Sequence, residues 1–193
     1  NYDMASMPPE QYDTYKDLSN VTLLGTITNY ISYVGFNMGH FDKATGEHVF
    51  EPGKKMSDPA LRKAIAYALD NDQVAKETYQ GLRISANTLL SPFFGEIYAD
   101  KSEIPGFTYN PEESKKILAD AGYKDTDGDG YVEDKDGKQL TITFLVATGS
   151  QTDDAVVQQY IEWWKNVGLR VELLNGRALE FNAYAEKLTK YAD

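Results

Sequence analysis

Apolar residues alternate with polar ones in some stretches of the chain and recur at helical spacing in others. Residues 20–28 and 30–38 are rich in β-branched and aromatic side chains, which predicts two strands. Residues 41–56 contain Gly and Pro and are expected to form a loop. Residues 1–19 carry no clean period, so they are interpreted as an irregular lead-in.

Two segments share the signature of a helix start, which is a capping residue followed by proline. Asp58 and Asn110 each precede a proline, whose missing N–H costs nothing in the first turn. The first helix is expected to pause near residues 70–72 and to end at Gly81, and the second to end at Gly122. The irregular, Pro- and Gly-punctuated stretch between them is long, and long loops in compact domains are often functional.

The C-terminal third predicts a strand, a helix and a second strand in succession. The first strand covers residues 139–147, the helix begins after Ser150 or Thr152, and the second strand covers residues 169–174. This unit is long enough for a crossover between two parallel strands. Residues 177–191 are predicted to form a final helix. Alternating strands and helices indicate a layered α/β domain.

Composition narrows the classes of function. The 193 residues include 19 Lys+Arg and 30 Asp+Glu, so the net charge is −11 and binding to nucleic acid or anionic lipid is disfavoured. A hydrophobic content of 41% is too high for a disordered chain. The absence of Cys excludes disulfides, thiolate zinc sites and cysteine nucleophiles. The chain has no apolar run of the ~18 residues that a spanning helix needs, and it is expected to be soluble.

Motifs for enzyme chemistry are scarce. The two histidines, His40 and His48, lie beside or within the predicted loop, and no nucleophile elbow, dinucleotide fingerprint or P-loop occurs. Acidic pairs fall in the first turns of predicted helices, where the helix dipole explains them. The chain is therefore predicted not to be an enzyme. A glycoside-processing enzyme stays as an alternative, because it would need only a carboxylate pair in a cleft.

An acidic segment carries the sharpest local motif. The run DTDGDG places carboxylates at positions one, three and five of a calcium-type loop and glycine at position six. Position twelve is an Asp where a longer, bidentate Glu is usual. The six candidate ligands are Asp125, Asp127, Asp129, Tyr131 through its carbonyl, Glu133 and Asp136. A solvated acidic turn explains the same residues, so both interpretations stay open; no cofactor is required, and Ca²⁺ is the candidate ion.

Aromatic side chains concentrate on the second predicted strand. Tyr30, Tyr33 and Phe36 lie close together there, flanked by Asn29 and Asn37. Alternate residues of a strand share a face, so one face could line a ligand cleft. The other interpretation is that these rings build the core of a sheet.

Several segments, in this order, resemble the peptide-binding class of extracellular solute-binding proteins, family 5, which feed ABC importers. Residues 33–38 (YVGFNM) resemble a family strand that ends in Asn. Residues 58–70 are similar to the pattern D-x-x-x-R-x-A-I-x-x-A-I-D, and residues 109–123 to Y-x-P-E-x-A-K-x-L-L-x-x-A-G-Y. Residues 157–171 resemble the helix and strand that follow. The resemblance covers residues 20–175 and is closest to Gram-positive oligopeptide-binding lipoproteins.

The resemblance implies a type II periplasmic-binding-protein-like lobe, with a mixed sheet flanked by helices. Family members are longer and have two lobes, so residues 20–193 are expected to be one lobe, the second, cut from a longer chain. The Asp-Gly-rich turn recurs in the family. The parent would be a monomer held by a lipid anchor at the extracellular face of the cell membrane.

The implied function is capture of an oligopeptide between two lobes and its delivery to the permease subunits of an ABC importer. Topology places the cleft-facing residues on the aromatic strand and the irregular loop: Tyr30, Tyr33, Asn37, Asn87 and Ser91. The family also includes receptors for nickel, haem and sugars, which stay as alternatives. A calcium-stabilised structural module is a further alternative.

Overall fold

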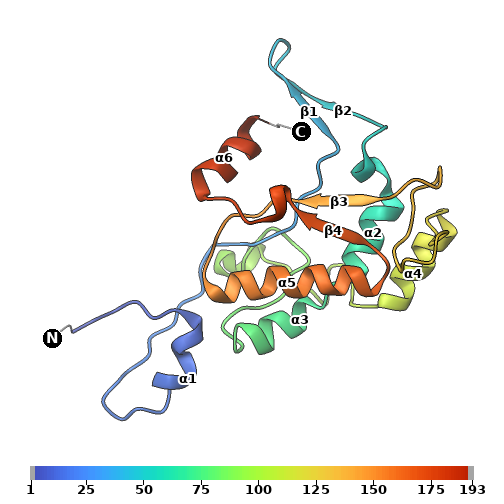
Figure 1. The fold of residues 1–193 in the computed structure, drawn as a ribbon. Coiled ribbons are helices and arrows are strands. Elements are labelled where there is room, and N and C mark those ends of the chain that lie inside the picture. Colours follow the sequence, from blue (N-terminus) through green and yellow to red (C-terminus); the bar gives the residue numbers. More distant parts are fainter. Residues whose placement is uncertain (1–2, 191–193) are drawn as a thin grey trace. The chain divides into compact units, whose positions relative to one another are not determined.

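The computed structural model describes residues 3–190, and the chain divides into two compact units (Figure 1). The first unit comprises Asn1–Tyr33 and Asp70–Phe107, and the second comprises Val34–Leu69 and Thr108–Asp193. The lobe predicted over residues 20–193 includes parts of both units, and its boundaries stay a prediction.

The second unit contains most of the regular structure. Its elements are the hairpin strands β1 (Gly39–Asp42) and β2 (Glu47–Phe50), a 3-10 turn (Lys55–Ser57), helices α2 (Pro59–Tyr67) and α4 (Pro111–Asp120), strand β3 (Thr141–Phe144), helix α5 (Gln151–Asn166), strand β4 (Arg170–Leu173), a 3-10 turn (Leu174–Gly176) and helix α6 (Phe181–Lys190). The strand–helix–strand order predicted for the C-terminal third is confirmed. Position 191 of the predicted last helix lies outside the described residues.

Strands β3 and β4 pair in parallel, and helix α5 lies between them in the sequence. The register places Ile142 opposite Val171, both of them buried, and Thr143 opposite Glu172, both exposed. This period of two gives one face to the core and one to water. Parallel and antiparallel pairing both occur, but in two separate two-stranded sheets and not in the single mixed sheet that was expected.

The first unit is mostly irregular. Its helices are all short: a 3-10 turn (Pro9–Gln11), α1 (Tyr12–Tyr15), α3 (Asn71–Gln73), which continues as a π-helical turn (Val74–Thr78), and a second 3-10 turn (Pro92–Ile97). Helix α1 lies inside the lead-in, which was predicted to be irregular throughout. The predicted pause near residue 70 and the restart after it are confirmed, because Asp70 caps α3 by accepting a hydrogen bond from the Gln73 N–H at 2.9 Å.

The two strands predicted over residues 20–28 and 30–38 do not form. Both stretches are irregular and have no ladder partners among the described residues. A β-branched, aromatic composition favours an extended backbone, but a strand also needs a neighbouring strand to bond with.

The loop predicted over residues 41–56 contains a hairpin instead. Asp42 accepts hydrogen bonds from the Ala44 N–H at 2.8 Å and the Thr45 hydroxyl at 3.0 Å, and Gly46 adopts a φ of 75°. These short-range contacts form a tight turn that lets β1 and β2 meet. The turn chemistry was visible in the sequence, but the flanking strands are too short and too polar to be recognised.

Capping side chains fix the starts of α2, α4 and α5. Asp58 accepts from the Ala60 N–H at 2.8 Å, and Asn110 accepts from the Glu113 N–H at 3.0 Å, as predicted. Of the two candidates for α5, Ser150 is the cap, in a reciprocal capping box with Asp153. Each cap satisfies one of the orphan N–H groups of a first turn.

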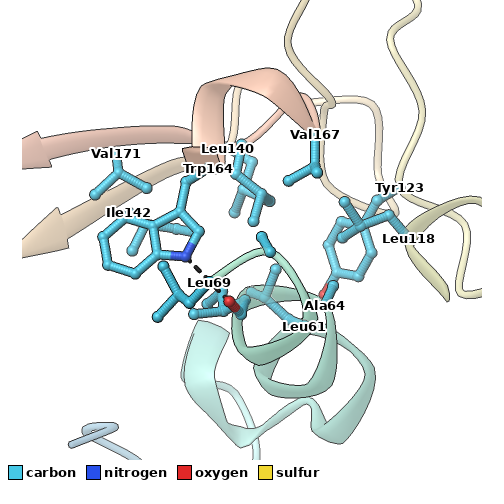
Figure 2. Packing of buried hydrophobic residues seen from close by; sticks show 13 residues of the cluster. Leu61, Ala64, Leu69, Leu118, Tyr123, Leu140, Ile142, Trp164, Val167 and Val171 are labelled. Atoms are coloured by element: carbon cyan, nitrogen blue, oxygen red, sulfur yellow. Dashed lines mark hydrogen bonds between the residues drawn. The ribbon is translucent and has the colours of Figure 1, made fainter. Parts of the chain in front are cut away.

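The core of the second unit lies where α2, α4 and α5 meet the two parallel strands (Figure 2). Leu61, Leu118 and Leu169 come from three different elements or their ends, and all are almost completely buried. Trp164 points from α5 toward α2, and its indole N–H donates to the Ile65 carbonyl at 3.1 Å. Ser114, which is fully buried, donates to the Ala64 carbonyl at 2.8 Å and joins α4 to α2.

We expect Leu118→Ala to destabilise the second unit by ~2–5 kcal/mol, because it removes buried methyl groups and leaves a cavity between α2 and α4. The matched control, Lys115→Ala, changes an exposed position of the same helix and should cost about 0.5 kcal/mol or less. Urea denaturation followed by tryptophan fluorescence measures both, since Trp163 and Trp164 both belong to this unit. Equal losses for the two variants would contradict the proposed core.

Candidate functional site

Tyr30 and Tyr33 are two strongly exposed residues among the predicted ligand contacts. They are 86% and 75% exposed, and both lie on an irregular stretch of the first unit. Ile31 is half-buried. The structure therefore leaves these two rings accessible for a ligand and does not use them as a sheet core.

Asn37 belongs to the second unit and lies just before the hairpin. Its side-chain oxygen accepts a hydrogen bond from the Gly39 N–H at 3.2 Å, which is a local turn contact, and the residue is exposed. Phe36 beside it is half-buried against the hydrophobic core. Asn37 thus lies between an irregular stretch of the chain and the hairpin.

Asn87 and Ser91 lie on the irregular loop of the first unit, and the structure gives both of them internal partners. The Asn87 amide donates to the carbonyls of Lys101 at 3.3 Å and Ile104 at 3.0 Å. The buried Ser91 hydroxyl donates to the Thr28 carbonyl at 2.5 Å, and its oxygen accepts from the Phe93 N–H at 3.2 Å. Both side chains therefore organise the loop.

The acidic loop brings four of its six candidate ligands together. Carboxylate oxygens of Asp125, Asp127, Asp129 and Glu133 all lie within 4.8 Å of one another. Within the described chain, Asp136 does not join this group. The cluster has the hard oxygen donors that Ca²⁺ prefers, drawn from the alternate positions that the motif predicts.

Main-chain N–H groups already hold these carboxylates. Asp125 accepts from the Gly128 N–H at 2.7 Å and from the Gly130 N–H at 2.9 Å, and Glu133 accepts from both the main chain and the hydroxyl of Thr126 at 2.6 Å. Glu133 is buried, whereas the three aspartates are exposed. The loop is thus shaped by its own hydrogen bonds.

Arg170, at the start of β4, contacts this loop, and the sequence analysis did not identify it. Its guanidinium pairs with Asp129 and lies 4.2 Å from the centre of the Tyr131 ring. A metal ion bound by Asp129 would have to compete with this cation. The signal was weak: a single arginine in a strand that is 41 positions from its partner.

Asp58 ties the acidic segment to helix α2. Its second carboxylate oxygen accepts from the Tyr123 hydroxyl at 2.8 Å and pairs with Lys135 at 2.6 Å. Burial alone would raise the pKa of Asp58, but the hydrogen bonds from Lys135, Tyr123 and the Ala60 N–H outweigh it and hold this pKa below its usual range. Burial and the bond to Asp58 raise the pKa of Tyr123.

The family follows from comparison with known proteins. The profile "Bacterial extracellular solute-binding proteins, family 5 Middle" matches residues 1–191. The chain therefore belongs to this family of bacterial extracellular solute-binding proteins. Its fold is an α/β lobe of the type II periplasmic-binding-protein kind, as the sequence predicted.

Individual relatives refine this class. The chain is 32% identical over 190 residues to the oligopeptide-binding protein OppA of Lactococcus lactis subsp. lactis, covering 97% of this chain and 31% of the relative. The structure of lactococcal OppA complexed with an endogenous peptide in the closed conformation matches with a TM-score of 0.85 and 31% identity, over 95% of this chain and 34% of that one.

A second solved relative binds a defined peptide. The oligopeptide-binding protein AppA from Bacillus subtilis, in complex with a nonapeptide, matches with a TM-score of 0.61 and 30% identity, over 68% of this chain and 25% of that one. The chain thus spans about a third of the length of these lactococcal relatives. None of the helices in residues 3–190 has the length and apolar character needed to cross a bilayer.

Because the Asp58 pKa is lowered in the folded state, its ion pair stabilises the protein above the unfolded pKa of about 3.9 and loses this effect as pH falls through the lower folded value. We expect Asp58→Asn to lower stability at pH 7 by about 1 kcal/mol, since Asn keeps the cap but lacks the negative charge that pairs with Lys135. The deficit should shrink as pH falls below about 4.

Urea denaturation from pH 7 to pH 3 measures this difference. The control is Asp120→Asn, which removes an exposed pair with Lys116 on the surface of α4 and should cost about 0.5 kcal/mol or less. A deficit of Asp58→Asn that does not change over this pH range would contradict the assigned ion pair.

Proposed function

We propose that this chain is the ligand-capturing lobe of an extracellular oligopeptide-binding receptor that delivers peptides to the permease of an ABC importer by closing about a hinge. One observation carries the proposal: the similarity over nearly the whole chain to a peptide-bound lactococcal receptor. The relatives that match at 30% identity or more over most of this chain are oligopeptide-binding proteins.

The first unit supplies a surface that suits an extended peptide. Residues 22–33 form no ladder in the described structure, so their main-chain groups do not belong to a sheet. Main-chain groups of such a segment can bond to the main chain of a peptide, and this mode accepts many sequences because every peptide has the same backbone. Tyr30 and Tyr33 project exposed rings from the same segment.

We assign Tyr30, Tyr33 and Asn37 as ligand contacts. An exposed tyrosine offers a large apolar surface with few rotatable bonds and a hydroxyl at its tip, so it binds side chains of varied chemistry at low entropic cost. Asn37 is exposed beside the hairpin and can exchange its local turn contact for one with a ligand. Binding followed by hinge closure needs no bond-breaking chemistry, so the proposed role is that of a receptor and not of an enzyme.

We expect the full-length receptor, purified from its own cells and gently denatured, to release a mixture of short peptides that mass spectrometry identifies. A sugar, haem or a nickel chelate in their place would keep the fold and replace the ligand. An empty protein that also fails to bind added peptides would refute the peptide assignment.

Substitution of the two tyrosines tests the contact surface. Tyr30→Ala with Tyr33→Ala should weaken peptide binding by roughly tenfold or more, as expected for aromatic anchors that each contribute more than about 1 kcal/mol. Tyr15→Ala is the control, because Tyr15 is an exposed tyrosine of the same unit but lies on helix α1. Calorimetry with one defined peptide measures all three proteins, and equal affinities would contradict the assignment.

A calcium-stabilised acidic loop is a second candidate function, and the gathering of four carboxylates within 4.8 Å favours it. The ion would be held by Asp125, Asp127, Asp129 and Glu133, with the Tyr131 carbonyl as a possible fifth donor. We infer a structural role, since the same segment is tied to α2 through Lys135 and Asp58.

Added Ca²⁺ should then raise the melting temperature of the protein by several degrees, and a chelator should reverse the rise. Asp125→Asn with Asp127→Asn should abolish the response, whereas Asp120→Asn, an exposed change on α4, should keep it. A melting temperature that does not change with Ca²⁺ would contradict the calcium site. The loop would then be an acidic turn in which Arg170 pairs with Asp129.

A further inference from the structure

The loop over residues 82–106 of the first unit is long, and within it only Pro92–Ile97 forms helical turns. Several of its apolar side chains are exposed: Leu89, Phe93, Phe94 and Ile97. Ordering such a loop costs conformational entropy that burial of these side chains does not offset. The ordered loop therefore depends on other contacts, and the ones described below are hydrogen bonds and an ion pair.

Three side chains bond to one another at the base of the loop. Asp72, on helix α3, accepts hydrogen bonds from the Ser85 hydroxyl and the Lys101 ammonium group. Lys101 also donates to the Ser85 oxygen at 2.8 Å, which closes the triangle. Because Ser85 and Lys101 lie near the two ends of the loop, the triangle joins these ends to α3.

Asn87 adds a second tie inside the loop. Its amide nitrogen bonds to the carbonyls of Lys101 and Ile104, so both of its hydrogens are directed to main-chain acceptors. Gly106 packs directly against this amide, and a Cβ there would lie 2.2 Å from the Asn87 Cγ. Only glycine fits at position 106 without displacing the Asn87 side chain.

We propose that Asp72, Ser85, Asn87 and Lys101 form a clasp that positions the loop over residues 82–106 for the ligand, and that Asn87 is a positioning residue and not a ligand contact. The second part follows from the amide nitrogen, because both of its N–H groups already bond to carbonyls of the loop, so donation to a peptide would break the tie. The proposal rests on the proposed function, since it takes the loop to be part of the ligand surface.

The size of the expected effect follows from exposure. The Lys101 and Asp72 side chains are 42% and 67% exposed, so their ion pair is weak, and the clasp works through several modest ties together. Loss of a clasp contact lowers the fraction of receptor molecules whose loop can bind a peptide. The apparent dissociation constant for the peptide rises in inverse proportion to that fraction. Loss of one tie should weaken peptide binding about two- to fivefold.

Two variants break the same tie from opposite sides. Asn87→Asp keeps the size of the side chain but presents a carboxylate to two carbonyls, and Gly106→Ala pushes the native amide out of place. Gly25→Ala is the matched control, because a Cβ at this exposed glycine of the same unit meets nothing within 4 Å. Lys101→Met breaks the triangle without touching Asn87.

Hydrogen exchange of the main chain over residues 88–100, measured without ligand on the 193-residue chain, reads the clasp directly. We expect faster exchange for Asn87→Asp, Gly106→Ala and Lys101→Met, unchanged exchange for Gly25→Ala, and a double variant of positions 87 and 106 that is no faster than either single one. Unchanged tryptophan fluorescence should show that the second unit stays folded.

Peptide affinity of the full-length receptor separates the two roles of Asn87. Positioning predicts that Gly106→Ala weakens binding as much as Asn87→Asp does. Loss of binding in Asn87→Asp alone, with loop exchange unchanged, would overturn the proposal and make Asn87 a contact. A wild-type receptor that binds no peptide would refute the proposed function, while faster loop exchange in the variants would still support the clasp.

Discussion

The last turn of helix α2 presents three carbonyl groups that accept hydrogen bonds from outside the helix, and the second unit is assembled around them. Ser114 of α4 donates to the Ala64 carbonyl, Trp164 of α5 donates to the Ile65 carbonyl, and the main-chain N–H of Asn110 donates to the Tyr67 carbonyl at 2.8 Å. Every helix end needs such partners. Here they come from two distant segments, α4 with its cap residue and α5, so bonding to one short helix also fixes the positions of α4 and α5 against it.

The N-terminal end of α2 fixes the position of the acidic segment, as the C-terminal end fixes α4 and α5. Asp58 caps the helix with one oxygen and holds Tyr123 and Lys135 with the other. A side chain that joins a helix start, the end of the next long helix and a polar loop couples their positions. The acidic loop is therefore held on the core unit whether or not it binds an ion, and its carboxylates are already gathered by main-chain N–H groups.

Sequence reasoning succeeded where the determining contacts are local. The caps Asp58, Asn110 and Ser150 act on N–H groups two or three residues away, so the pattern alone located three helices. It failed for residues 20–38, because strand formation depends on a partner that composition does not encode. It also missed the pair of Arg170 with Asp129 and the triangle of Asp72, Ser85 and Lys101, whose members are joined only by folding.

The two units are stabilised by different kinds of contact, and this division suits a receptor. The buried cluster drawn in Figure 2 lies entirely in the second unit, where a cavity would strongly lower the stability of the fold. In the first unit, the loop over residues 82–106 depends on exposed polar ties, each of them weak. Segments that must adapt to many ligands are drawn from the less stable parts of a protein, because small free-energy differences there allow rearrangement. The unit with the buried core can therefore keep its fold while the polar-tied loop of the first unit rearranges.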